Sequence, residues 1–553
     1  MLVDSGVLTA GQLDEALKKQ KGSGKRLGRV LIDEHYISET QLIETLCMQL
    51  GIEFIDLNDV TIDPSMAALI PKSLAKKEHV VPIKLVRDTL FIAMEDPINF
   101  VAIENIKNTT RKRIVTMIAY SDAIERAISN LYENEGAAKA IEQMREEGIF
   151  GSSSERNAQE KDEANEAPTV KLVNSILERG ISEKASDIHI EPREDGMVVR
   201  IRVDGRLNTI LKIPSDLQSA VISRLKIISG MNIAERRIPQ DGRAIIQRDN
   251  GQDVDMRLNS LPTIYGEKIV VRLLIRDKSY LTREGIGITK RDNAKFDRIL
   301  KNTSGVILIV GPTGSGKTST LYTMINELKQ DTVNMISLED PVEFQIDGVT
   351  QVAINEKVGL TFANALRACL RQDPDIICIG EIRDGETAEI AMRAAMTGHL
   401  VLSTIHTEDT VSAIDRLRDM GIAPYLIAGS VRGVVSQRLV RRICPNCRTE
   451  VTPKQEILNL VGMSNNSGQR FYAGKGCNMC FDSGYKGRTG VFEILPVSAA
   501  LRTQIATGAN GSELRQKVTE SGDFVSMLEN GKQLVEQGVT TVDELVRTII
   551  TVD

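Results

Sequence analysis

One short motif constrains the fold of this chain more than any other feature. The apolar run 306–310 leads directly into Gly-Pro-Thr-Gly-Ser-Gly-Lys-Thr at 311–318, and a segment with helical spacing follows. This is a complete Gly-x4-Gly-Lys-Thr pattern in the strand, loop and helix context that it requires. The glycines let backbone N–H groups turn inward around phosphate oxygens, and the next helix adds its positive N-terminal end. The sequence therefore predicts a phosphate-binding loop in a parallel α/β core.

The residues of this loop have distinct expected roles. We expect Lys317 to neutralise the β- and γ-phosphates of ATP and the Thr318 hydroxyl to coordinate Mg²⁺. The expected nucleotide-binding residues are Gly311, Pro312, Thr313, Gly314, Ser315, Gly316, Lys317, Thr318 and Ser319.

Acidic residues follow two further strand patterns. Residues 335–338 lead into Glu339, and residues 376–379 lead through Gly380 into Glu381. A carboxylate at the end of a core strand beside a phosphate-binding loop holds Mg²⁺ through water or polarises the attacking water. Acids can also simply cap strand ends, but two acidic clusters, at 339–343 and 381–384, favour a catalytic role for carboxylates at this place.

Two of the five histidines flank another short apolar strand. We expect His399 and His406 to lie at the same edge of the sheet as the loop and to sense the nucleotide. The simpler alternative for either one is a structural histidine.

Length and composition limit the other possibilities. A chain of 553 residues is too long for one core, so two to four domains are expected. The net charge of −6 and the absence of tryptophan argue against a general nucleic-acid binder. The apolar stretches are far shorter than the roughly 20 residues that span a bilayer, and no signal peptide is evident, so we expect a cytoplasmic protein.

The patterning divides the chain into four parts. Residues 1–134 hold a repeat at an offset of 29, with a helix start at 9–12 and another at 38–41, and then two strand-like runs at 80–85 and 89–93. Residues 135–168 are polar and are expected to form a linker. Alternating residues predict a sheet domain at 169–285. Residues 286–553 alternate strands and helices, as an α/β core does, and end in a helix opened by Thr541 and Glu544.

Four cysteines form two pairs with metal-ligand spacing. Cys444 and Cys447 are separated by 29 residues from Cys477 and Cys480, and two such knuckles can hold Zn²⁺ tetrahedrally in a closed structural site. We expect a zinc-binding insert at about 440–490, with free cysteines as the alternative.

The motifs at 311–318, 338–343, 371–384 and 397–407, in this order, resemble the secretion ATPase superfamily of type II secretion and type IV pili. The resemblance implies a RecA-like core preceded by a PAS-like α+β sheet domain and a small helical N-terminal module. It implies a homohexameric motor at the cytoplasmic face of the inner membrane. The implied partners are a polytopic inner-membrane platform protein and an adaptor, and direct nucleic-acid binding is not expected. The tetracysteine insert marks assembly and secretion members of the family.

Glu339 and Glu381 match the family's two catalytic carboxylates. The resemblance also assigns residues outside the core. Arg243, Arg257 and Arg272 match arginines that the sheet domain supplies to the phosphates, where a guanidinium stabilises transition-state charge. Surface ion pairs are the alternative for each.

The N-terminal repeat resembles a module that binds cyclic di-GMP in some family members. Arg26, Leu27 and Gly28 match one of its two motifs, but His35 replaces a glycine, and the first copy has no Arg-Leu-Gly of its own. Either the true start lies upstream or half of the ligand site is missing. Cyclic di-GMP binding and docking of a membrane-complex partner both stay open.

Two rival functions follow from the same residues. A related ATPase for DNA uptake or conjugation would share the motifs, and an assembly scaffold would bind ATP without hydrolysing it. The scaffold is disfavoured by the joint presence of Lys317, Glu339, Glu381, His399 and His406.

Overall fold

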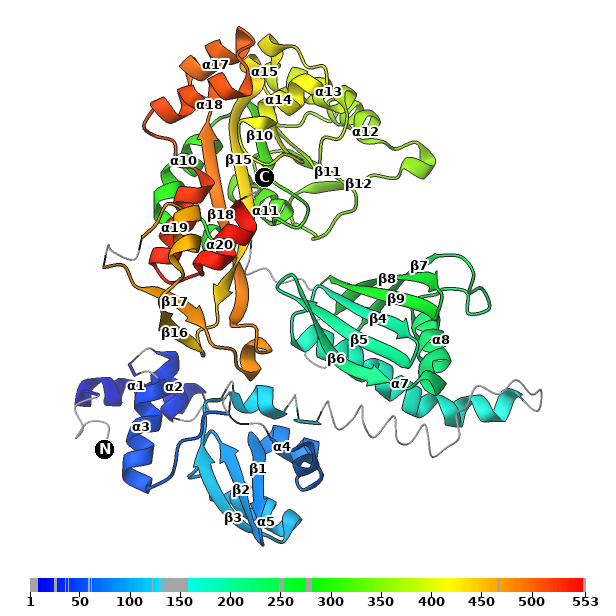
Figure 1. Cartoon of the computed structure of the whole chain (residues 1–553), viewed down its shortest axis with the longest axis vertical. Helices are drawn as coiled ribbons and strands as arrows, with labels where there is room; N and C mark the ends of the chain where they lie inside the picture. The colour runs from blue at the N-terminus through cyan, green and yellow to red at the C-terminus, as the bar shows by residue number, and fades with distance from the viewer. Residues whose placement is uncertain are drawn as a thin grey trace. The chain divides into compact units, whose positions relative to one another are not determined.

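The structure is a computed structural model that divides into two compact units, Met1–Ile275 and Arg276–Asp553 (Figure 1). Each unit is described by itself. The described residues are 8–23, 27–34, 36–37, 39–57, 60, 62–121, 123–128, 131–132, 158–247, 253–274, 281–464 and 468–550.

The first unit begins with three short helices, α1 (Ala10–Ser23), α2 (Leu27–Asp33) and α3 (Glu39–Leu50). Helices α1 and α3 start 29 residues apart, as the repeat predicts. At the start of α1, Thr9 and Gln12 hydrogen-bond each other's backbone N–H groups, which is the expected capping box. Ser38, the expected cap of the second copy, lies outside the described residues, and so do Arg26 and His35.

A small α/β layer follows these helices. Among the described residues it comprises η1 (Pro64–Ala68), α4 (Lys72–Glu78), β1 (Val80–Val86), β2 (Thr89–Met94), α5 (Phe100–Thr110) and β3 (Arg113–Ile118). Strands β1 and β2 are antiparallel, and β3 joins β2 in parallel after the α5 crossover. The two predicted strands at 80–85 and 89–93 are confirmed.

The remainder of the first unit is a sheet domain, whose described strands have the order β6-β5-β4-β9-β8-β7. The elements are α7 (Ala158–Ser182), β4 (Asp187–Arg193), β5 (Gly196–Val203), β6 (Arg206–Ile213), η2 (Ser215–Leu217), α8 (Gln218–Ile228), β7 (Gln240–Ile246), β8 (Val254–Thr263) and β9 (Gly266–Leu274). Ile188, Val271 and Leu273 are buried on the face that α7 covers (Figure 1). The side chains between them point to the opposite face.

The predicted linker needs one correction. Residues 158–168 belong to α7, although the sequence analysis assigned them to the linker. This segment is polar, but Ala, Glu, Lys and Gln favour helix on local grounds alone. The helix then continues into Leu172, Val173 and Ile176, which are buried and hold α7 on the sheet.

The second unit contains a sheet whose described strands have the order β12-β11-β13-β14-β10-β15-β18. The strands are β10 (Gly305–Val310), β11 (Met335–Glu339), β12 (Thr350–Ala353), β13 (Ile376–Ile379), β14 (Leu400–Ile405), β15 (Val431–Ile443) and β18 (Tyr485–Pro496). All neighbours in this sheet are parallel except β15 and β18.

Helices cover both faces of this sheet, which confirms the predicted α/β core (Figure 1). On one face lie α10 (Lys290–Leu300) and α11 (Lys317–Leu328), with α9 (Arg283–Ile286) beside them. On the other lie α12 (Phe362–Cys369), α13 (Gly385–Met396), α14 (Ser412–Asp419) and α15 (Pro424–Ser430), followed by α17 (Ala499–Ala506) and α18 (Gly511–Glu520). A single-turn helix, η4 (Glu356–Val358), precedes α12.

The cysteine-rich insert and the tail share a separate small core. The described elements are β16 (Arg448–Val451), α16 (Gln455–Leu460), β17 (Phe471–Gly474), η6 (Asn478–Cys480), α19 (Met527–Glu536) and α20 (Val542–Ile549). Leu458 and Phe471 of the insert pack with Val542 and Leu545 of α20. Thr541 caps α20 as predicted, but the Glu544 carboxylate binds Arg441 and Arg547 instead of returning to the cap.

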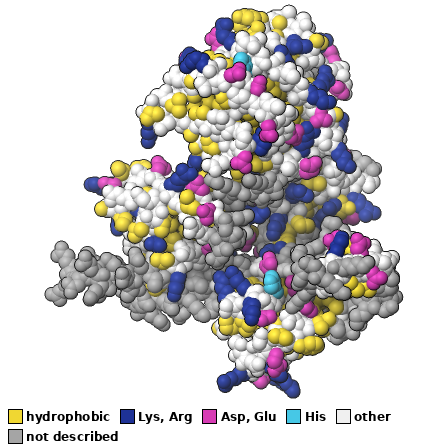
Figure 2. Space-filling view, turned by 180° about the vertical axis from the view of Figure 1, so that it is seen from behind, with side chains coloured by type: hydrophobic (Ala, Val, Ile, Leu, Met, Phe, Trp, Pro, Cys, Tyr) yellow, Lys and Arg dark blue, Asp and Glu magenta, His cyan; other side chains and the backbone are white. Residues whose placement is uncertain are grey.

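None of the described helices is long and apolar enough to cross a membrane. On the face seen in Figure 2, Lys and Arg side chains are interspersed with Asp and Glu.

Candidate nucleotide-binding site and metal centre

The phosphate-binding loop connects a fully buried strand to a buried helix. Strand β10 ends at Val310, and α11 begins at Lys317. Gly311 has φ +148°, and a Cβ atom there would lie 2.4 Å from the Gln437 carbonyl oxygen on β15. Only glycine fits this position, because both the dihedral angle and the contact exclude a side chain. The loop is therefore built as the motif predicts.

Buried polar groups line this loop. The Lys317 Nζ atom donates to the carbonyl oxygens of Gly311 at 2.9 Å and Pro312 at 3.0 Å. Burial lowers the pKa of Lys317, and Glu381 opposes that shift. The Ser315 hydroxyl is buried and has no hydrogen-bond partner within the described part of the chain. A buried ammonium and an unpartnered hydroxyl at a helix N-terminus suit an anionic polyphosphate ligand.

The strand register brings three other functional residues to the same edge. Val310 pairs with Ile405, so His406 follows β14 beside the loop. Ile379 pairs with both Ser403 and Leu338, so Glu339 at the end of β11 and Glu381 just beyond β13 lie at the ends of adjacent strands. The carboxyl ends of parallel strands meet at one edge, as the sequence analysis assumed.

His406 links the loop to the first carboxylate. Its Nδ1 atom lies 3.4 Å from Lys317 Nζ, and its Nε2 atom lies 3.1 Å from Glu381 Oε2. The tautomer with hydrogen on Nε2 accepts from Lys317 and donates to Glu381. Arg383 binds the other oxygen of Glu381 and lies 3.7 Å from Asp340. Glu381 is therefore held between a histidine and an arginine.

Glu339 is more enclosed than Glu381. Its side chain is buried, with 6% of the residue exposed. Tyr322 donates to its Oε2 at 2.5 Å, while Ser337 at 2.6 Å and Gln351 at 3.0 Å donate to Oε1. Tyr322, Ser337 and Gln351 were missed by the sequence analysis, because in the sequence they look like ordinary helix and strand positions. No local pattern signals a contact between Gln351 on β12 and Glu339 on β11.

The expected placement of His399 is wrong. It precedes β14, and its carbonyl oxygen accepts from Gly305 N–H at the start of β10. Six strand residues separate it from His406, so the two histidines lie about 20 Å apart at opposite ends of β14. The His399 Nδ1 atom lies 2.9 Å from the Ala394 carbonyl oxygen at the end of α13. Within this chain, His399 therefore has a structural contact rather than a place at the loop.

The three arginines of the sheet domain form one row. Arg243 pairs with Arg257, and Arg257 pairs with Arg272, on neighbouring antiparallel strands. Side chains directly opposite one another share a face, and this is the face that α7 leaves open. Arg243 binds Asp255, and Arg272 donates to Asp187 at 3.0 Å. Among the described residues, Arg257 has no side-chain partner.

The four predicted cysteine ligands converge. The Sγ–Sγ distances are 3.9 Å for Cys444–Cys477, 3.8 Å for Cys447–Cys480 and 3.7 Å for Cys477–Cys480. A tetrahedron of Zn–S bonds of about 2.3 Å has edges of about 3.8 Å, so the thiols fit a zinc-sized ion. The backbone N–H groups of Cys477 and Gly484 each lie 3.3 Å from Cys480 Sγ and can stabilise a thiolate.

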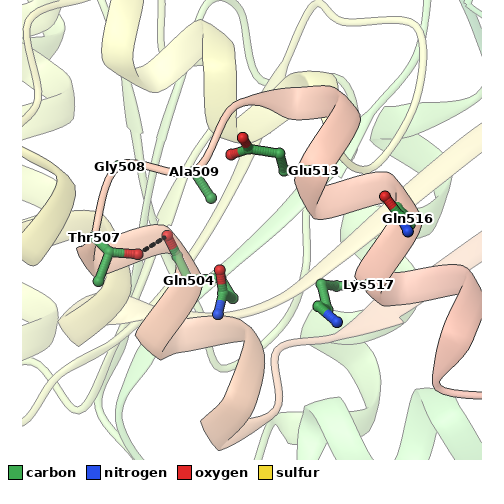
Figure 3. A pocket seen from close by; sticks show the side chains of 7 residues that line it. All are labelled: Gln504, Thr507, Gly508, Ala509, Glu513, Gln516 and Lys517. Carbon is green, nitrogen blue, oxygen red and sulfur yellow. Dashed lines mark hydrogen bonds between the residues drawn. The ribbon is translucent and has the colours of Figure 1, made fainter.

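A cleft of about 380 Å³ lies elsewhere in the second unit, between α17 and α18. Figure 3 shows Gln504 and Thr507 on one side and Glu513, Gln516 and Lys517 on the other. None of the predicted site residues lines this cleft, and the Thr507 hydroxyl is already bonded to the Gln504 carbonyl oxygen. The cleft therefore adds nothing to the nucleotide site.

Comparison with known proteins finds relatives along the whole chain. A model of the family described as "Type II/IV secretion system protein" matches residues 162–547, and a model of the MshEN domain matches residues 50–138. The type IV pilus assembly ATPase PilB of Myxococcus xanthus is 39% identical, covering 99% of this chain and 97% of that protein. Type II secretion system protein E of Pseudomonas aeruginosa is 37% identical, with 89% and 98% covered.

Among solved structures, the ATPase DotB of Yersinia pseudotuberculosis has a TM-score of 0.52 at 20% identity. The match covers 72% of this chain and 96% of that chain. At this identity the likeness shows the fold alone.

Proposed function

Because this chain belongs to the Type II/IV secretion system protein family and is a P-loop ATPase, we propose that it is a hexameric motor for type IV pilus assembly or type II protein secretion. It would act at the cytoplasmic face of the inner membrane on a polytopic platform protein, through an adaptor. The observation that carries the proposal is the meeting of the phosphate-binding loop with Glu339, Glu381 and His406 at one sheet edge.

The roles in hydrolysis follow from position. Lys317 leaves the carbonyl groups of its own loop to neutralise the β- and γ-phosphates of ATP. Thr318, in the first turn of α11, would hold Mg²⁺, with a carboxylate acting through water. Glu339 is proposed to orient and activate the attacking water, because it is fixed by three donors. Glu381 is proposed to position Mg²⁺ and to report the phosphate state through His406.

The arginine row supports coupling of hydrolysis to motion. Three guanidinium groups on one open sheet face form a surface suited to phosphate charge, and no side chain among the described residues already pairs with Arg257. We propose that the sheet domain closes over nucleotide bound to a core. Ring assembly would restrict the positions that the sheet domain can take relative to that core. Closing and opening of this domain would transmit the chemical step as movement.

We also propose that the four cysteines hold Zn²⁺ as a structural ion. The metal would fasten the insert, which shares its core with α20. This role needs no open coordination position, and none of the four ligands takes part in hydrolysis.

The N-terminal module is proposed to regulate the motor by binding cyclic di-GMP. The supporting observations are the matched MshEN domain model and the placement of Leu27 and Gly28 at the start of α2. Calorimetric titration of the full chain with cyclic di-GMP tests this, with Arg26→Ala as the variant. Saturable binding that the variant loses supports regulation by cyclic di-GMP. If the full chain gives no heat of binding, docking of a membrane-complex partner is the role that stays for the module.

Hydrolysis is tested by substitution at the three central groups. Lys317→Ala should abolish ATP turnover, and Glu339→Gln and Glu381→Gln should bind ATP with little turnover. Glu389→Gln is the control, because Glu389 lies exposed on α13 and, within the described part of the chain, pairs with Arg393 alone. Turnover at the wild-type rate in the Glu381 variant would show that its catalytic assignment is wrong. ATP binding without turnover in the wild-type chain would favour the scaffold.

A further inference from the structure

Tyr322 connects the phosphate-binding helix to the buried carboxylate. It lies five residues after Lys317 on α11, and only 1% of it is exposed. Its hydroxyl donates to Glu339 Oε2 at 2.5 Å and accepts from the backbone N–H groups of Glu343 and Phe344, both at 3.3 Å. A phenol has one donor and two acceptor sites, so every hydrogen-bonding site of this hydroxyl is used.

The surroundings of Tyr322 hold its ring in place. Phe344 meets the ring edge to face, with 5.5 Å between the ring centroids. Gln351 binds the Phe344 carbonyl oxygen and Ile346 N–H while it also donates to Glu339. The segment after β11, the carboxylate and α11 are therefore tied into one network.

This arrangement exceeds what packing alone requires. A phenylalanine would fill nearly the same volume, but it would leave Glu339 Oε2 and two backbone N–H groups without their donor or acceptor. Burial and the bond to Glu339 raise the pKa of Tyr322 above its ordinary value, so the hydroxyl remains a donor throughout the physiological range. Ser337 acts on the other oxygen of the same carboxylate, from the strand that carries Glu339.

We propose that Tyr322 is a positioning residue for ATP hydrolysis. With Ser337 at the opposite oxygen, it aligns the Glu339 carboxylate with the phosphate-binding loop, whose helix carries both Tyr322 and Lys317. The inference rests on the proposed role of Glu339. Because α11 carries both Lys317 and Tyr322, a displacement of this helix on nucleotide binding would reach the Glu339 carboxylate through the Tyr322 hydroxyl.

The test is Tyr322→Phe in the full chain, with steady-state phosphate release and binding of MgADP. We expect kcat to fall about ten- to a hundredfold while KM for ATP and Kd for ADP stay within about twofold, because binding is left intact. Tyr132→Phe is the matched control. It removes another buried hydroxyl, bonded to the Ile70 carbonyl oxygen at 2.6 Å in the N-terminal module, and should leave kcat unchanged.

A double variant separates positioning from general damage. If Tyr322 acts through Glu339, adding Tyr322→Phe to Glu339→Gln should not lower the residual rate further. A further loss of tenfold or more in the double variant, or wild-type kcat in the single variant, overturns the proposal.

Two other outcomes are also decisive. Wild-type turnover in Glu339→Gln would remove the role of Glu339 and with it this inference, while ATP hydrolysis itself would stand. If Tyr322→Phe does not fold, Ser337→Ala decides. The same loss of kcat at constant KM in Ser337→Ala supports positioning of the Glu339 carboxylate by its two hydroxyl donors, and wild-type kcat in this variant overturns the proposal.

Discussion

Alanine variants of the two histidines compare the candidate site, at one end of β14, with the other end of the same strand. His406→Ala removes the contacts to Lys317 Nζ at 3.4 Å and to Glu381 at 3.1 Å. A hydrogen bond to a charged group contributes about 1.5–3 kcal/mol. Half of the His406 side chain is exposed, so we count the two contacts as one such bond. The expected loss in kcat is therefore about ten- to a hundredfold.

The matched variant is His399→Ala. His399 lies at the other end of β14 and contacts the end of α13 instead of the loop, so kcat should stay within about twofold of the wild-type value. His406→Gln should recover part of the lost rate, since an amide can accept from Lys317 and donate to Glu381. Phosphate release at saturating MgATP measures the rates, and thermal melting shows that each variant folds. Equal losses in the two alanine variants would refute the placement of His399, and an unimpaired His406→Ala would refute the link between the loop and Glu381.

Three further outcomes follow from other parts of the chain. Purified protein should carry about one zinc ion per chain, and Cys444→Ser should lower both the metal content and the solubility; reduced protein with no zinc by metal analysis would contradict this. Glu544→Gln should cost about 3–5 kcal/mol in free energy of unfolding, because it breaks a buried pair with Arg441, whereas the exposed Glu529→Gln should cost little. Burial alone would raise the pKa of Glu544, but its hydrogen bonds to Arg441 and Arg547 outweigh burial and lower that pKa. The stabilisation by Glu544 is therefore complete above the pKa of the unfolded state, about 4.3, and is lost as pH falls through the pKa of the folded state. Denaturant titrations in which the wild-type and Glu544→Gln chains differ equally in stability at pH 7 and pH 3 would contradict this. Arg257→Ala should lower kcat at least tenfold with ADP affinity retained, while Arg206→Ala on β6 should leave kcat unchanged. Equal kcat values in these two variants would show that Arg257 takes no part in catalysis.

The positions of residues that short, local motifs define could be predicted from the sequence. The phosphate-binding loop and the cysteine pairs carry their chemistry in short motifs, and the structure places both as expected. Glu339 and Glu381 could be placed because parallel strands bring their ends to one edge. The pattern also identified β1, β2 and the start of α1.

Positions that depend on contacts between elements far apart in the sequence could not be predicted from short motifs. His399 is seven residues from His406, and the error was to treat two ends of a strand as one edge. Residues 158–168 are polar, which suggested a linker, but local helix propensity and the buried positions that follow extend α7 through them. Tyr322 and Gln437 look like ordinary helix and strand positions in the sequence. Their contacts with Glu339 and Thr320 come from elements far apart in the chain.

Assembly is what most distinguishes the proposed motor, because in that proposal a ring holds the arginine row of one sheet domain over nucleotide bound to a core. The direct measurement is light scattering of the full chain with Mg²⁺ and a non-hydrolysable ATP analogue, combined with ATP turnover per chain over a range of protein concentrations. We predict that the analogue favours a particle with the mass of six chains and that specific activity rises with protein concentration. A single-chain mass with concentration-independent turnover at micromolar protein would contradict it.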